Sequence, residues 1–399
     1  MRWAVVYGLI AFGNRRLLPT CCHSVIIGVC VCTLYRHATK GFALTDTELR
    51  LAKIVEAFSN PDAAGSNFED YLALCADEVG ELVNGYIPTN ENADINRYLY
   101  DPLVRFSQNA GKRHRPLICF AACAAVGGDI KRAVSSAAAI EHFHSAALVH
   151  DDIADKADLR RGEPCLHHSE GIGLAINIGD LGLSLVNGTV IRDPELDDAT
   201  KVRVVTELID MTRRTIEGQA LDIGWARDGR YDIKQEDYLL MATLKTAHYS
   251  GAVPLAIGAI VGGGSDIEIE ALRNYGLDTG LAFQIQDDLL NLVGTEEATK
   301  KDFRNDITEG KRTLCVVHAL EHSPKRERLV QILAAGEHDP AVLQEAVDIM
   351  EESGSIAFAR AYAENLTSIA KNHLMMVLPA SPARDMLASM ADWFVNRLN

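Results

Sequence analysis

Residues 141–162 read EHFHSAALVHDDIADKADLRRG, an apolar helical run that ends in three aspartates. Asp151 and Asp155 are four residues apart, so they share one helix face, and Asp152 lies three residues before Asp155. At the C-terminal end of a helix, carboxylates repel one another and oppose the helix dipole, which costs roughly 0.3–1 kcal/mol each. They therefore fit either a solvated acidic helix end or a site for a hard divalent cation such as Mg²⁺.

A second acidic cluster repeats this arrangement further along the chain. Residues 284–291 read QIQDDLLN, and Asp287 shares a helix face with Asn291. The neighbouring positions are apolar, which argues against a polar stripe on an exposed helix. Two acidic helices of a bundle can face each other and hold shared metal ions, so we expect Asp287 and Asp288 to lie opposite the first cluster.

The chain from Asp46 onward predicts an all-α fold. Alanine is frequent, proline is sparse, and apolar residues recur at spacings of three and four, which is the spacing of one buried helix face. No linker is long enough to separate two independent domains. We therefore expect a single-domain helix bundle over residues 46–399.

Residues 1–45 differ in composition from this domain. They contain five Lys and Arg residues and no acidic residue. Two apolar runs, at 3–12 and 25–34, fall well short of the ~20 residues that span a bilayer as a helix. This composition favours an organelle-targeting or membrane-associating leader, and the alternative is a translated extension without a fold. We accordingly expect a mitochondrial or plastid protein in the first case and a cytoplasmic one in the second. Membrane association is expected only through this segment.

The formal net charge of −16 argues against a nucleic-acid partner, because phosphate backbones favour basic surfaces. A smaller polyanion can still bind through metal ions and local basic patches. Such patches accompany both acidic clusters, at 111–116 (GKRHRP), 160–161 (RR), 245 (K), 300–301 (KK) and 310–313 (GKRT). Guanidinium and ammonium groups beside Mg²⁺ are suited to binding a diphosphate.

Together these motifs resemble the trans-isoprenyl diphosphate synthases (polyprenyl synthetases), in particular the geranylgeranyl diphosphate synthase group. The matching stretches are 111–116, 141–162, 176–180 (INIGD), 218–222 (GQALD), 245–246 (KT), 283–291 and 301–313 (KDFRNDITEGKRT). The resemblance covers residues 68–399 and leaves the leader uncovered. It implies an all-α bundle around a deep central cavity, which usually forms a homodimer.

The resemblance also implies ligands and roles. Isopentenyl diphosphate and an allylic diphosphate (dimethylallyl, geranyl or farnesyl) would be the substrates, with three Mg²⁺ ions per active site that Mn²⁺ can replace. The metal ligands would be Asp151, Asp152, Asp155, Asp287 and Asp288. Isopentenyl diphosphate would bind Lys112, Arg115, His144 and Arg161, and the allylic diphosphate Arg160, Lys245, Lys301 and Lys311. Thr246 and Gln284 would stabilise positive charge on the allyl group.

One residue departs from the pattern of many family members. The second cluster ends in Asn291, where aspartate is common. Asparagine still offers a carbonyl oxygen, and members of the geranylgeranyl group often carry it. We therefore expect the departure to be compatible with activity.

The helix before the first cluster suggests a limit on product length. Ala146 and Ala147 lie about one turn before Asp151 and are small, so the aromatic floor that gives farnesyl-length products is missing. Phe143 lies eight residues before Asp151, about 12 Å along a helix. We expect Phe143 to help stop elongation near twenty carbons. The alternative is that Phe143 is an ordinary core residue.

Two other functions are compatible with this scaffold. A terpene cyclase would ionise an allylic diphosphate without adding isopentenyl diphosphate. Retention of the four residues expected to bind isopentenyl diphosphate argues against it. A non-catalytic partner subunit of a prenyl synthase would tolerate loss of the acidic clusters, and both clusters are present.

Overall fold

The computed structural model describes residues 45–59, 67–109, 111–294 and 304–396. The predicted leader therefore lies outside the described residues except for Thr45. Residues 46–399 form one compact unit. In the part of the chain that the structure describes, the fold is all-α with one small hairpin, which confirms the fold class predicted from the sequence.

The elements before the first acidic cluster, and the cluster helix itself, are α2 (Asp46–Ser59), α4 (Phe68–Asn84), α5 (Ala93–Ile95), the π-helix η1 (Asn96–Tyr100), α6 (Asp101–Gln108), α7 (His114–Ala125), the 3₁₀ helix η2 (Ile130–Ala133) and α8 (Val134–Ala154). The hairpin strands β1 (Leu159–Arg160) and β2 (Glu163–Pro164) follow, and then α9 (Leu166–Ser169), α10 (Ile172–Ile191), α11 (Asp198–Arg227), α12 (Gln235–Ala242), the π-helix η3 (Thr243–Ala252) and α13 (Val253–Gly262). The second cluster lies on α14 (Asp266–Val293), after which come α16 (Asn305–Thr308), α17 (Leu314–His322), α18 (Arg326–Ala335), α19 (Pro340–Glu352), α20 (Ser355–Val377) and α21 (Pro382–Val395).

Helix α8 is the central element of the bundle and is buried on most of its surface. It packs against α4, α7, α10 and α13, and its small residues, such as the run Ala137–Ala139, allow close contact. Three ionisable residues in its middle, Glu141, His142 and His144, are buried as well. A buried charged group needs a specific partner, so this stretch of α8 points to a site.

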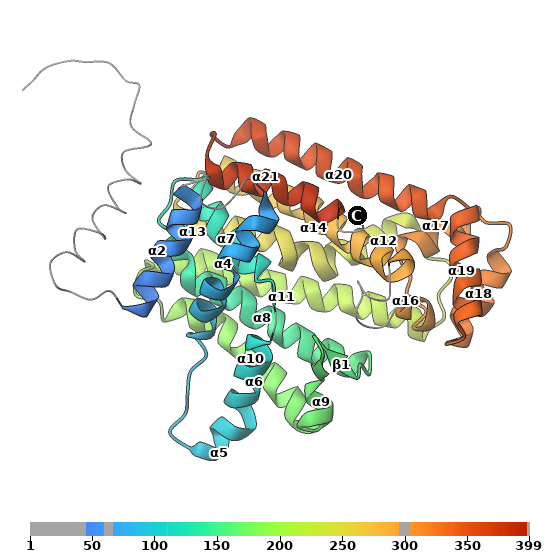
Figure 1. Ribbon diagram of the computed structural model, residues 1–399, viewed down its shortest axis with the longest axis horizontal. Coiled ribbons are helices and arrows are strands. Elements are labelled where there is room, and N and C mark those ends of the chain that lie inside the picture. The colour runs from blue at the N-terminus through green and yellow to red at the C-terminus, as the bar shows by residue number, and fades with distance from the viewer. Residues whose placement is uncertain (1–44, 60–66, 110, 295–303, 397–399) are drawn as a thin grey trace, which may run out of the picture. The chain divides into compact units, whose positions relative to one another are not determined.

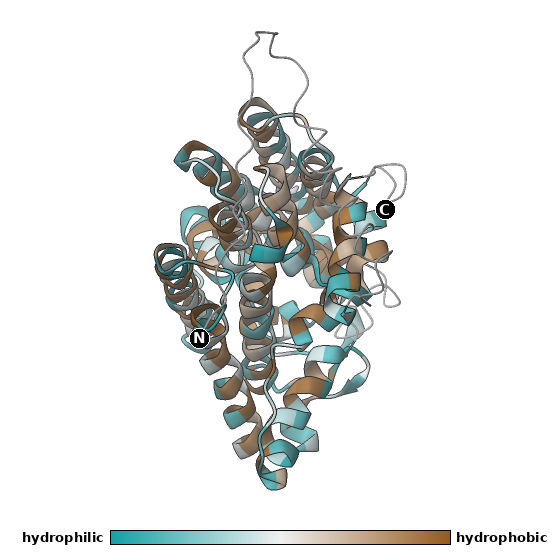
Figure 2. Ribbon diagram, turned by 90° about the vertical axis from the view of Figure 1, so that its left-hand side faces the viewer, coloured by the Kyte–Doolittle hydropathy of each residue, from teal (hydrophilic) through white to brown (hydrophobic). Residues whose placement is uncertain are grey.

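The second acidic helix, α14, lies beside α20 (Figure 1). Its start is fixed by a capping box, in which Ser265 and Glu268 satisfy each other's backbone N–H groups. α14 packs against η3 on one side and α20 on another. Most helices carry both hydrophobic and hydrophilic residues (Figure 2), as expected when each buries one face.

Two close backbone contacts hold η3 in place. A Cβ atom on Gly251 would lie 2.2 Å from the carbonyl oxygen of Gly276 on α14, and one on Gly218 of α11 would lie 2.2 Å from the backbone nitrogen of Lys245. Both positions therefore require glycine. As a result, the π-helical segment is held between α11 and α14, which is where the predicted residues Lys245 and Thr246 lie.

One described helix, α10, is long and apolar enough to cross a membrane by length and composition. A core helix of a soluble protein passes the same test. In this bundle α10 packs along α8, and 44% of its apolar window is buried.

Candidate active site

The first acidic cluster lies where α8 ends. Asp151 and Asp155 line a cavity of about 1410 Å³, together with Leu148 and His144, which lie about one and two turns before Asp151 on the same helix. Gln219 Nε2 donates a hydrogen bond to Asp151 Oδ1 at 2.7 Å. Burial and the nearby charge of Asp151 raise the pKa of Asp155. The first cluster thus presents two of its three carboxylates to the cavity.

Asp152 points elsewhere. Its side chain is 1% exposed and does not line the cavity; its Oδ1 accepts a hydrogen bond from Arg160 Nε at 2.8 Å. Arg160 comes from the β1–β2 hairpin that follows α8. The sequence predicts Asp152 as a metal ligand; its Oδ1 holds Arg160, while its buried Oδ2 has no hydrogen-bond partner among the described residues, so that prediction stays open. Asp152 follows Asp151 directly on α8, and successive residues of a helix point about 100° apart, so the two side chains face different directions.

The second acidic cluster faces the same cavity from α14. Asp287, Asp288 and Asn291 all line it. The Tyr238 hydroxyl donates a hydrogen bond to Asp288 at 2.8 Å and Gln284 Nε2 donates another at 2.7 Å. Burial is the main reason that the pKa of Asp288 rises to about 7. The two clusters therefore contribute carboxylates to one cavity, as the sequence predicted.

Asn291 has a structural partner that accounts for an amide at this position. Its Oδ1 accepts a hydrogen bond from the backbone N–H of Asp306 at 3.2 Å, and its own carbonyl oxygen accepts one from the backbone N–H of Arg304 at 3.0 Å. The residue therefore fixes the segment that re-enters the cavity after α14. An accepting oxygen is enough for this contact, and a charge is not needed.

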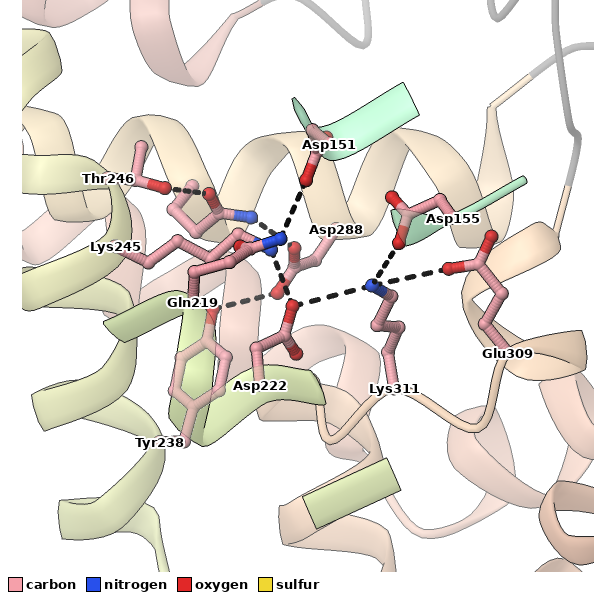
Figure 3. Close-up of polar contacts among 11 residues, drawn as sticks. Asp151, Asp155, Gln219, Asp222, Tyr238, Lys245, Thr246, Asp288, Glu309 and Lys311 are labelled. Atoms are coloured by element: carbon pink, nitrogen blue, oxygen red, sulfur yellow. Dashed lines mark hydrogen bonds and ion pairs between the residues drawn. The ribbon is translucent and has the colours of Figure 1, made fainter. Parts of the chain in front are cut away.

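Two lysines lie between the acidic helices (Figure 3). Lys245 donates a hydrogen bond to Asp222, and Lys311 Nζ lies 3.4 Å from both Asp155 and Asp222 and 3.3 Å from Glu309. Burial alone would raise the pKa of Asp222, but the charges of the two lysines lower it below its ordinary value. Asp222 therefore stays ionised and holds both ammonium groups at the cavity wall.

A hydrogen-bonded chain links η3 to the second cluster. The Thr246 hydroxyl donates to Gln284 Oε1, and the amide of Gln284 donates in turn to Asp288 (Figure 3). The two residues expected to stabilise positive charge on the allyl group are thus in contact with each other. Both line the cavity.

A smaller pocket of about 190 Å³ adjoins the cavity and is strongly basic. Its ionisable lining comprises Lys112, Arg113, His114, Arg115, Glu141, His144 and Arg161, and Phe283 and Trp393 are apolar walls. Five of these residues also line the larger cavity: His114, Arg115, His144, Arg161 and Phe283. The two spaces therefore share a wall that an anion and a second ligand can contact together.

Buried polar contacts fix the basic side chains of this pocket. Arg113 forms an ion pair with Glu141 in which both side chains are at most 5% exposed. Arg115 donates to His144 Nε2 at 3.1 Å, while Arg161 donates to the backbone carbonyl of Asn109 at 2.6 Å. Burial and then the Arg115 charge lower the pKa of His144 well below its ordinary value, so the ring is neutral and accepts that hydrogen bond.

Several loops beside these two spaces have strained backbone. In the described ranges, four residues other than glycine have a positive φ: Arg113, Lys156, Arg161 and Arg304. Arg113 and Arg161 line the basic pocket, and Lys156 lines the larger cavity. Such conformations cost about 1–3 kcal/mol each and persist where the surrounding structure enforces them, often at functional sites.

Comparison with known proteins gives a consistent result. The family model described as Polyprenyl synthetase matches residues 96–350. A short chain isoprenyl diphosphate synthase from Methanothermobacter thermautotrophicus is 42% identical over 303 residues, covering 74% of this chain and 91% of that protein. A geranylgeranyl diphosphate synthase from Sulfolobus acidocaldarius is 32% identical and covers 75% of this chain and 88% of its own. The chain belongs to the polyprenyl synthetase family.

Solved structures of the family have the same fold. A geranylgeranyl pyrophosphate synthetase from Pyrococcus horikoshii superposes with a TM-score of 0.76 at 32% identity, covering 82% of this chain and 98% of that one. A geranylgeranyl pyrophosphate synthase from Corynebacterium glutamicum, solved with isoprenyl diphosphate and magnesium, superposes with a TM-score of 0.74 at 28% identity. The protein is a trans-prenyltransferase, as the sequence predicted, and the family to which it belongs is generally Mg²⁺-dependent.

Within this synthase, the structure brings most of the predicted site residues together. Those that line the larger cavity are Arg115, His144, Asp151, Asp155, Arg160, Arg161, Lys245, Thr246, Gln284, Asp287, Asp288 and Lys311. Lys112 lines the basic pocket only. Lys301 lies outside the described residues.

The predicted chain-length residues do not line the cavity directly. Phe143 is 2% exposed and packs edge-on against Tyr249, with ring centroids 5.7 Å apart. Ala146 faces α10, where a Cβ on Gly182 would lie 2.9 Å from its own Cβ. Ala147 packs against the main hydrophobic core. The predicted limit on product length used residues of α8 alone, whereas the cavity wall beside α8 is also formed by η3 and α14.

Sequence reasoning missed several polar residues of this synthase's cavity. Asp222, Tyr238, Asp306 and Glu309 all line it. Asp222 ends the GQALD stretch, and Asp306 and Glu309 lie inside KDFRNDITEGKRT, so both motifs contained the signal. Tyr238 has no motif of its own and becomes visible only through its contact with Asp288.

Proposed function

We propose that this synthase condenses isopentenyl diphosphate with an allylic diphosphate to give geranylgeranyl diphosphate. The observation that carries the proposal is the wall shared by a carboxylate-lined cavity and a basic pocket. The cavity suits a metal-bound allylic diphosphate, and the pocket suits a second diphosphate. Names of the relatives support the product class, since several are geranylgeranyl diphosphate synthases.

The donor set of the cavity fits Mg²⁺. Asp151, Asp155 and Asp287 supply oxygen ligands only, which a small hard cation prefers, and the raised pKa of Asp288 is the mark of crowded, buried carboxyl groups that a cation would relieve. In the described residues, no three His, Cys, Asp or Glu side chains lie close enough together to hold a metal ion without rearrangement. When bound with the diphosphate, Mg²⁺ supplies positive charge against the leaving group. Three ions, replaceable by Mn²⁺, are part of this proposal.

The protein's own cations act on the allylic diphosphate. Lys245, Lys311 and Arg160 stabilise the negative charge that builds up on the diphosphate as the allylic C–O bond breaks. The hydroxyl of Thr246 and the amide oxygen of Gln284 lie beside the allyl group and favour its positive charge. Lys301, from the same predicted set, is assigned to this group by the sequence.

The basic pocket holds the second substrate for attack. Lys112, Arg115, His144 and Arg161 bind the diphosphate of isopentenyl diphosphate, whose double bond then forms a new C–C bond to the allyl cation. The adjacent carbon loses a proton to the released diphosphate, which balances the reaction. Exclusion of water is essential because hydrolysis would consume the cation.

A homodimer completes the proposal. Helix α11 exposes four apolar side chains at seven-residue intervals, Val202, Ile209, Ile216 and Ile223, which are 66%, 52%, 59% and 40% exposed. A seven-residue apolar repeat is typical of one helix packing along another. Neighbouring α10 exposes Ile172, Ile176 and Ile191. Dimers are typical of the family, and a second copy of this chain would cover these side chains.

The test is a product assay on the full chain with Mg²⁺, labelled isopentenyl diphosphate and, in turn, dimethylallyl, geranyl or farnesyl diphosphate. We expect prenyl diphosphates of about twenty carbons, the length that the position of Phe143 suggests. A cyclised hydrocarbon would indicate a terpene cyclase instead. Absence of turnover by the folded protein would overturn the proposal in favour of a non-catalytic subunit.

A further inference from the structure

Tyr249 contacts both the basic pocket and the predicted chain-length residue. It lies on η3 four residues after Lys245 and lines the larger cavity. Arg115 Nη2 donates a hydrogen bond to its hydroxyl at 3.1 Å, and the guanidinium carbon lies 4.6 Å from the ring centroid. The ring also packs edge-on against Phe143, with centroids 5.7 Å apart, and stacks on His144 at 6.0 Å.

We infer that Tyr249 has two separable roles in the condensation. Its hydroxyl positions Arg115 for the diphosphate of isopentenyl diphosphate, and its ring forms the wall that limits the growing chain. The inference rests on the proposed function, since it assigns to Tyr249 a part in binding isopentenyl diphosphate and a part in limiting product length.

The first role follows from the hydrogen bonds of Arg115. This buried guanidinium makes two hydrogen bonds to Ser250, one to His144 and one to Tyr249. A guanidinium is planar, so partners on all three nitrogens fix its plane. Tyr249 and Ser250 are neighbours in sequence, and the π-helical segment directs both of them toward Arg115. Without the hydroxyl, Nη2 of Arg115 keeps only its hydrogen bond to Ser250, and the orientation of the guanidinium is less defined.

The second role follows from the burial of Phe143. That ring is almost fully buried and does not line the cavity, whereas the Tyr249 ring in contact with it does. The growing chain therefore meets Tyr249 first, and Phe143 supports the tyrosine from behind. Leu148 and Phe283 provide further apolar lining for a hydrocarbon in the same cavity.

The first experiment removes only the hydroxyl. Tyr249→Phe in the full chain should raise the KM for isopentenyl diphosphate about tenfold, because a hydrogen bond to a charged group contributes on that scale. The KM for farnesyl diphosphate and the product length should stay unchanged. The Kd of isopentenyl diphosphate, measured by calorimetry without allylic substrate, should rise by the same factor. Tyr362→Phe, a half-buried tyrosine on α20 outside both spaces, is the matched control and should leave every value unchanged.

The second experiment removes the ring. Tyr249→Leu should lengthen the products beyond twenty carbons in addition to raising the KM, and Tyr249→Met provides a second ring-free variant if the leucine protein does not fold. An active wild type with an unchanged KM in Tyr249→Phe would overturn the positioning role. Unchanged product length in the folded ring-free variants would overturn the wall. An inactive wild type would instead overturn the proposed function, and this inference with it.

Discussion

Asp222 shows how one carboxylate organises the cations of the site. It is 5% exposed on α11 and accepts a hydrogen bond from Lys245, and Lys311 approaches it from the segment after α16. These lysines come from parts of the chain 66 residues apart. Because both ammonium groups share Asp222, each one keeps a partner when the cavity holds no diphosphate.

We expect Asp222→Asn to lower kcat/KM for the allylic substrate by about a hundredfold. The neutral amide cannot hold two ammonium groups, and two weakened charged hydrogen bonds are worth roughly 3 kcal/mol. The KM for isopentenyl diphosphate should change little, because the basic pocket does not include Asp222. Asp210→Asn, an exposed carboxylate on the same helix, should have no effect in the same steady-state assay. An equal loss for both substrates would contradict this role.

For individual residues, the sequence predicted which side chains belong to the site better than it predicted the directions in which they point. It identified Asp151, Asp155 and Asp287 because their spacing places each on a definable helix face. It did not predict that Asp152 also holds Arg160, since that contact depends on the hairpin that follows α8. Asp222 was hidden for a similar reason: its role depends on two lysines from distant segments.

Among the helices, the π-helical segment η3 is the feature with most influence on the site. Its position depends on Gly218 of α11, where an added Cβ would lie 2.2 Å from the Lys245 nitrogen and 2.7 Å from its Cα. Backbone atoms cannot move aside as a flexible side chain can. Any larger residue at 218 must therefore displace Lys245 and Thr246.

Gly218→Ala should destabilise the protein by about 1–3 kcal/mol and lower kcat/KM at least tenfold, because the extra methyl group forces a backbone shift. Gly224→Ala is the matched control on the same helix, as nothing lies within 4 Å of its added Cβ. Because alanine favours a helix more than glycine does, that variant should be as stable as the wild type or more stable by up to ~1 kcal/mol. Urea unfolding and steady-state rates on both proteins decide the question. Equal behaviour of the two variants would show that the contact does not constrain η3.

Helix α8 should give the fold an acid-sensitive element. Burial lowers the pKa of His142 to about 4, whereas an unfolded histidine titrates near ~6.5. As pH falls between these values, the unfolded state binds the proton first. The contribution of neutral His142 to the free energy of unfolding is thus complete above the pKa of the unfolded histidine and is lost toward pH 4.

His142→Gln should remove about 3 kcal/mol of that pH-dependent loss. The measurement is the free energy of unfolding in urea at several pH values between 7.5 and 4.5, compared with the wild type. If the glutamine protein loses stability as steeply as the wild type, His142 is not responsible.

For the whole molecule, the sequence predicted the fold class but not the walls of the cavity. Apolar spacing in the sequence was enough for an all-α bundle, because helix periodicity needs no knowledge of partners. The cavity walls were not predictable, since η3 is a π-helix and follows neither the period of an α-helix nor an alternating pattern. For this reason Tyr249, and not Phe143, lines the space beside α8.

The apolar repeat on α11 leads to a prediction about the assembly. The double variant Ile209→Lys and Ile216→Lys should sediment as a monomer at concentrations where the wild type sediments as a dimer, because it buries two charges in the proposed contact. Ile267→Lys is the control, since Ile267 is 73% exposed on α14 and outside the repeat. A wild type that sediments as a monomer, or a dimer that survives both lysines, would refute this interface.

The position of Trp393 also bears on how the protein is completed during synthesis. This residue lies near the end of α21, and its ring closes one side of the basic pocket with Lys112 Nζ 4.9 Å from the ring centroid. Every helix that carries an acidic cluster leaves the ribosome before α21 does. The space for the allylic substrate can therefore form on the nascent chain, whereas the pocket for the second diphosphate is finished last.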